Sequence, residues 1–100
     1  MDQLTKARRT IEETDRQMAL LFCRRMAAVR QIAAWKQAQG LPILDAEREE
    51  AILSANINAL PETTLRGYYA AFLRNLMEIS RAYQADLIGC SEEAEHDSQL

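Results

Sequence analysis

The first third of the chain has the hydrophobic pattern of one long amphipathic helix. Residues 4–39 contain no glycine or proline, and apolar or small side chains recur there in alternating steps of three and four. This spacing predicts a helix of about 50 Å, which Gly40 and Pro42 end. The positions on its stripe are Leu4, Ala7, Ile11, Thr14, Met18, Leu21, Ala28, Ile32 and Trp35.

A second, shorter helix is predicted from about Ala46 to Leu60. Asp45 follows the turn-forming sequence "GLP" and is a suitable N-cap, and Pro61 breaks the helix at its other end. The face expected to point inward carries Ile52, Leu53, Asn56, Ile57 and Leu60.

A third helix is predicted to start near Thr63 or Thr64, either of which could cap it. We therefore expect one all-α domain of three helices over residues 1–88. The remaining residues, 89–100, are polar and acidic, and we expect them to be disordered. The apolar face of the third helix carries Leu65, Tyr69, Phe72, Leu73, Leu76, Ile79, Tyr83 and Leu87.

The length of the first helix indicates self-association. Two short helices of the same chain cannot cover its whole apolar stripe, and a helix of this kind commonly pairs with a copy of itself. The sequence therefore predicts an obligate homodimer.

Polar side chains interrupt the apolar faces. Counting by sevens from Leu4 brings Arg25 to a core position, and Lys36, about three turns later, points nearly the same way. Ser80 and Gln84 lie one turn apart within the apolar face of the third helix. Buried cations need partners, and a small anion from outside would supply one. The alternative is that Arg25 pairs with a buried acid and that Ser80 and Gln84 form hydrogen bonds to the backbone.

Arg48 lies in the predicted first turn of the second helix, where the helix dipole disfavours a cation. This position is explained if Arg48 lines the same anion site. The alternative is an exposed arginine that pairs with the neighbouring Glu47, Glu49 or Glu50.

Composition and charge exclude several function classes. The net charge is −3, yet eight of the twelve lysines and arginines lie within the first 36 residues. No apolar run is long enough to cross a bilayer, and no signal peptide is recognisable, so we expect a cytoplasmic protein. Cys23 and Cys90 have no partner at metal-ligand spacing, and His96 lies in the tail. We expect small buried or idle thiols, no catalytic histidine and no metal or other cofactor.

In these features the chain resembles the all-helical (AroQ-class) chorismate mutases, of the monofunctional bacterial type. The resemblance extends from Leu4 to about Leu87 and rests on "ARRTIEETD", "CRRMAAV", "WK", "PILDAERE" and "EISRAYQ" in the same order and at the same intervals. It implies an intertwined dimer of three-helix protomers with two active sites. It also implies an isomerase that converts chorismate to prephenate, without a cofactor, in phenylalanine and tyrosine biosynthesis.

The resemblance assigns the catalytic roles. Lys36 and Gln84 resemble the pair that hydrogen-bonds the ether oxygen of the breaking C–O bond. Arg25 resembles the arginine that binds a substrate carboxylate in its own protomer, and Arg8 the one that crosses from the partner protomer. Arg8 and Arg25 are turned about 100° from each other on an ideal helix, which agrees with donation across a dimer.

Three further roles follow from the resemblance. Glu49, with the backbone near Asp45, resembles the group that holds the ring hydroxyl. Ser80 resembles a helper at the ring carboxylate, and Arg48 resembles the arginine at the mouth of the second helix.

Two other functions stay open. Pyruvate elimination from isochorismate, giving salicylate, needs a similar dicarboxylate pocket on the same fold. The second is that of a non-catalytic helical module, which would bind nucleic acid through the basic first helix. Arg25 and Lys36 lie on or beside the stripe that must be buried, so we expect neither nucleic acid nor a membrane as partner.

Overall fold

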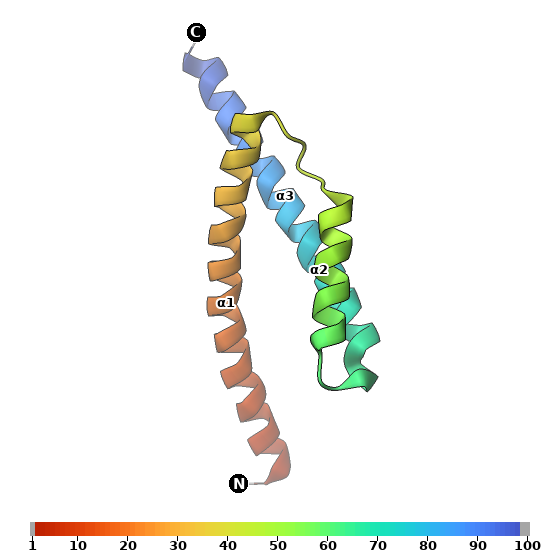
Figure 1. The fold of residues 1–100 in the computed structure, drawn as a ribbon. Coiled ribbons are helices and arrows are strands. Elements are labelled where there is room, and N and C mark those ends of the chain that lie inside the picture. The colour runs from red at the N-terminus through yellow and green to blue at the C-terminus, as the bar shows by residue number, and fades with distance from the viewer. Residues whose placement is uncertain (1, 99–100) are drawn as a thin grey trace.

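The computed structural model describes the backbone of residues 2–98 and the side chains of residues 2–89. Within this range the chain is all-helical and has three α-helices, of which α1 and α3 are long and α2 is short (Figure 1). The all-α, three-helix prediction is therefore confirmed. The elements are α1 (Gln3–Gln39), α2 (Ala46–Ala59), the 3₁₀ turn η1 (Thr63–Leu65) and α3 (Arg66–Ser98).

Helix α1 has the boundaries that the sequence predicts, and both ends are capped. The Asp2 carboxylate accepts a hydrogen bond of 2.7 Å from the Thr5 backbone N–H. This bond holds the pKa of Asp2 below its usual value, so the cap is present at neutral pH and is lost as the pH falls through that lowered pKa. At the other end Gly40 adopts a left-handed conformation with φ 67°, which favours glycine over other residues.

Helix α2 also starts where predicted. The Asp45 carboxylate accepts a hydrogen bond of 3.0 Å from the Arg48 backbone N–H, which satisfies one of the unpaired donors of the first turn. The helix ends at Ala59 with Leu60 as its C-cap. The cap thus fixes the backbone of Arg48 and Glu49, two of the predicted site residues.

Substitution of Asp45 by alanine is expected to lower the free energy of unfolding by about 1 kcal/mol, because the N-cap bond is lost. Asp45→Asn should retain most of the stability, since the asparagine side chain also caps helices. Urea denaturation of the two variants measures the difference. An equal loss in both would contradict the capping role.

Helix α3 differs from the prediction at both ends. Neither Thr63 nor Thr64 caps it; the 3₁₀ turn comes first, and its N-cap residue, Glu62, makes no side-chain capping bond. At the other end the helix continues to Ser98, past the predicted boundary at residue 88. The side chains of Cys90 and His96 lie outside the described residues, and disorder of the tail stays a prediction.

Helix α3 lies between the other two and contacts both (Figure 1). The core between α2 and α3 contains the buried Leu53, Ala70, Leu73 and Met77, with Ile52, Ile57, Tyr69 and Leu76 packed against it. Leu53 was predicted to point inward, but the same prediction for Asn56 is wrong. Asn56 is exposed, and its amide donates a 2.8 Å hydrogen bond to the Ile52 carbonyl one turn earlier.

Helix α3 covers α1 only near its C-terminal end, on the same face as Ile11 and Met18, because Val29 lies five full turns after Ile11. The buried residues of α1 are Val29 and Ala33, whereas Ile11 and Met18 are 59% and 46% exposed. Every side chain from residue 2 to residue 24 is exposed, and this part of α1 extends away from the other helices (Figure 1). A single chain therefore leaves a long apolar surface uncovered, and the homodimer stays a prediction.

Candidate active site

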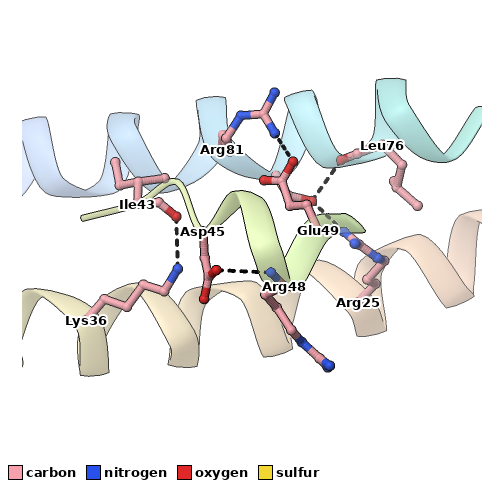
Figure 2. Close-up of polar contacts among 9 residues, drawn as sticks. Arg25, Lys36, Ile43, Asp45, Arg48, Glu49, Leu76 and Arg81 are labelled. Carbon is pink, nitrogen blue, oxygen red and sulfur yellow. Dashed lines mark hydrogen bonds and ion pairs between the residues drawn. The ribbon is translucent and has the colours of Figure 1, made fainter. Parts of the chain in front are cut away.

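Seven of the eight predicted site residues line one cleft between the three helices, with a volume of about 260 Å³. This volume is close to the lower end of small-molecule sites, about 300 Å³. Helix α1, the start of α2 and helix α3 each supply polar groups to it (Figure 2). The seven residues are Arg25, Lys36, Asp45, Arg48, Glu49, Ser80 and Gln84.

Arg25 is half-buried and contacts α3 directly. Its Nη1 donates a hydrogen bond to Ser80 Oγ, and that hydroxyl donates in turn to the Leu76 carbonyl at 2.8 Å. Ser80 is only 6% exposed. Among the described side chains no carboxylate pairs with Arg25, so the alternative of a buried acid is not seen. The positive charge of the guanidinium is therefore not neutralised by a described carboxylate and can pair with an anion in the cleft.

Lys36 lines the cleft and lies in the last turn of α1. Its ammonium donates a hydrogen bond of 2.8 Å to the carbonyl of Ile43, in the segment that joins α1 to α2 (Figure 2). The side chain is half-buried, and the last turn of a helix favours a positive charge. This contact restrains the ammonium while leaving two of its three donors for a ligand.

Gln84 is almost fully buried, with 7% of its surface exposed, and its Oε1 has no hydrogen-bond partner among the described residues. A buried amide without a partner is energetically unfavourable. The two ends of the amide can exchange places, so either a donor or an acceptor can be turned to the cleft. Such a group is typical of a site that a polar ligand completes.

Glu49 forms an ion pair with Arg81, a residue that the sequence pattern did not indicate as part of the site. The Arg81 Nη1 donates to Glu49 Oε1 (Figure 2), and both side chains line the cleft. Arg81 lies within the quoted segment "EISRAYQ", but its partner is on a different helix. No periodicity along one helix reveals such a pairing, so the sequence offered no signal for it.

Arg48 is exposed at the cleft, and its side chain points away from the Glu49–Arg81 pair (Figure 2). Within the described residues no glutamate pairs with it. The alternative of a surface ion pair with its neighbours is therefore not seen, and the guanidinium is free to meet an anion at the mouth.

Arg8 is the one predicted site residue that does not line the cleft. It lies on the exposed part of α1, seventeen residues before Arg25, which corresponds to about 25 Å along an α-helix. No rotation of its side chain spans that length. A single chain thus does not bring Arg8 to this site.

The cleft is electropositive. Four cationic side chains line it, against the two carboxylates of Asp45 and Glu49, which leaves a net charge of +2. A guest with two negative charges would balance this excess. The four cations are Arg25, Lys36, Arg48 and Arg81.

Two further observations bear on the class of site. No three histidine, cysteine, aspartate or glutamate side chains of the described residues gather as metal ligands would, and Cys23 is a free, exposed thiol. In the same part of the chain, no helix combines the length and apolar character that crossing a bilayer requires.

Comparison with known proteins agrees with this geometry. Residues 7–85 match the family model described as chorismate mutase type II. No match was found among curated proteins or among solved structures. The matched range includes Arg8 at one end and Gln84 at the other, and so contains all eight predicted site residues. The match covers far more than half of the 100 residues, and the chain belongs to the chorismate mutase type II family.

Proposed function

We propose that this protein is an isomerase that rearranges chorismate to prephenate, in the cytoplasm, for phenylalanine and tyrosine biosynthesis. The observation that carries the proposal is the cleft itself. Its cations, its buried hydroxyl and its buried amide come from three helices and face a volume suited to a small dianion. The reaction as proposed needs no cofactor, nucleic acid or membrane.

The chemistry is a concerted [3,3] shift within one molecule: the ether C–O bond breaks as a new C–C bond forms. No proton is transferred and no nucleophile attacks. The protein must hold the substrate in its compact, diaxial form and stabilise the charge that develops on the ether oxygen.

Positioning is assigned to the arginines. Arg25, oriented by its bond to Ser80, binds one carboxylate, and Ser80 assists at the ring carboxylate. Arg48 closes the mouth. Glu49, with the backbone near Asp45, accepts a hydrogen bond from the ring hydroxyl.

Lys36 and Gln84 donate to the ether oxygen. A well-placed donor in a dry site contributes roughly 3–4 kcal/mol to transition-state stabilisation. Two such donors with positioning reach about 8 kcal/mol, near a 10⁶-fold acceleration. Lys36 is already restrained by the Ile43 carbonyl, so little reorganisation is needed when the substrate binds.

A second copy of the chain completes the site by supplying Arg8. An apolar groove of about 710 Å³ between α1 and α3, lined by side chains such as Phe22, Phe72 and Ile79, is open in one chain. Together with the exposed stripe of α1 it offers the apolar surface that an intertwined homodimer would bury. Arg25 lines both this groove and the cleft, so a protomer seated in the groove lies next to the site.

The direct test is to incubate the purified protein with chorismate and to follow prephenate by chromatography. Formation of prephenate supports the proposal, and no reaction refutes it. The same assay with isochorismate distinguishes the related chemistry, since salicylate and pyruvate would appear in place of an isomerised product.

Gln84→Glu is expected to make activity depend on pH. A glutamine amide donates a hydrogen bond at any pH, whereas a glutamate donates only when it is protonated. The variant should therefore be active in acid and lose activity as the pH rises, while the parent protein stays active across neutral pH. Rates at pH 5 and pH 8 measure this.

Gln84→Ala is the control for this experiment, and it should be weakly active at both pH values. Equal rates of Gln84→Glu at pH 5 and pH 8 would refute the donor role of Gln84.

A further inference from the structure

We propose that Arg81 determines specificity: its ion pair with Glu49 makes the cleft select a neutral hydroxyl over an ammonium group on the substrate ring. This inference rests on the proposed function, in which Glu49 faces the ring hydroxyl. It concerns a residue to which neither the sequence pattern nor the mechanism above assigns a role.

The ion pair forms a wall of the cleft. Arg81 on α3 and Glu49 on α2 lie against each other, 31% and 25% exposed (Figure 2). Both side chains, with Met77, also line a second groove of about 420 Å³. The pair therefore separates the two spaces, and its charges act directly on whatever occupies the cleft.

The charge of Glu49 decides which substituent it prefers. A carboxylate has about four acceptor sites on its two oxygens, so Glu49 can bond to Arg81 and still accept a hydrogen bond from a hydroxyl. An unpaired carboxylate would attract an ammonium group more strongly than a hydroxyl. With Arg81 beside it the pair is electrically neutral, and this advantage of the ammonium group is reduced.

A purely structural role for the pair is the competing explanation. An ion pair that is this exposed contributes little to stability, and the contacts between α2 and α3 already include the apolar core around Leu53. The pair is thus not needed to hold the helices together, but its position at the cleft gives it an effect on ligand charge.

The test compares chorismate with 4-amino-4-deoxychorismate, which carries an ammonium group in place of the ring hydroxyl. In Arg81→Gln, and equally in Arg81→Met, the ratio of kcat/KM for the amino substrate to that for chorismate should rise by about fivefold or more. Arg81→Lys, which keeps the charge, should leave the ratio near that of the parent. Using two neutral variants keeps the test valid if one of them folds poorly.

Arg74→Gln is the matched control. Arg74 lies seven residues before Arg81 on α3, is exposed, and lines the second groove but not the cleft. The same loss of charge there should not change the ratio. In a Glu49→Gln background, Arg81→Gln should no longer raise the ratio, because the carboxylate through which it acts is gone.

An unchanged ratio in the neutral Arg81 variants, with chorismate still converted by the parent, would overturn this inference alone. An equal rise in Arg74→Gln would also overturn it, since the effect would then be one of general charge. If the parent protein does not convert chorismate at all, it is the proposed function that fails, and the two results are distinguishable.

Discussion

Replacement of Lys36 by alanine is expected to lower kcat/KM for chorismate by about 10²- to 10³-fold, the usual loss for one transition-state donor. The Lys36 ammonium is half-buried, is restrained by the Ile43 carbonyl and lies in the same cleft as the Gln84 amide. Its removal leaves the developing charge on the ether oxygen with one donor. Because that charge develops only in the transition state, kcat should fall together with kcat/KM.

Steady-state kinetics and circular dichroism of Lys36→Ala test this expectation. Arg30→Ala is the matched control, because Arg30 lies on the same helix, is exposed and does not line the cleft. It should keep the parent activity. A folded Lys36→Ala variant with unchanged kcat would contradict the assigned role, and a rise in KM alone would point to ground-state binding.

Local signals in the sequence were sufficient to predict the helices. The run without glycine or proline, Asp45 as a cap, and the stops at Gly40 and Pro61 set element boundaries that the structure reproduces closely. The α-helix α3 starts at Arg66, because residues 63–65 first form a 3₁₀ turn. Such turns are common at the N-termini of α-helices, and the two threonines alone do not distinguish a 3₁₀ turn from the first turn of the α-helix.

Contacts between helices were harder to predict. The stripe through Ile11 and Met18 marks an apolar face, but in one chain α3 covers that face only farther along the helix, at Val29 and Ala33. A period along the sequence identifies an apolar face without showing which neighbour covers it.

The polar residues of the site divide in the same way. Arg25, Ser80 and Gln84 could be found because polar groups within apolar stripes are unusual. Arg81 could not be identified in this way, because a charged residue next to the apolar stripe looks like any other solvent-exposed surface residue. Its importance appears only when α2 and α3 pack and bring it against Glu49.

Arg8→Ala is expected to lower kcat/KM by about 10²-fold or more, as loss of a charged contact to a substrate carboxylate would. This is a large effect for a residue that lies about 25 Å along the helix from Arg25 and outside the cleft of its own chain. The expectation follows only if a second protomer brings its Arg8 to the site.

The structure gives this arrangement physical support. The segment that carries Arg8 is exposed throughout, and apolar residues such as Leu4 and Ile11 stand beside it on the same helix. Burial of these residues against a partner is favourable. Arg9→Ala is a useful control, because it removes the same charge from the next position of α1.

A mixed dimer tests whether groups from two copies of this chain enclose the dianionic substrate. Arg8→Ala and Lys36→Ala are co-expressed with different affinity tags, and the heterodimer is isolated by two successive purifications. In a two-fold dimer with crossed Arg8 residues, one site receives both defects and the other is intact. We therefore expect about half of the parent activity per dimer. A heterodimer no more active than the two variants alone, or a protein that stays monomeric, would refute the crossed arrangement.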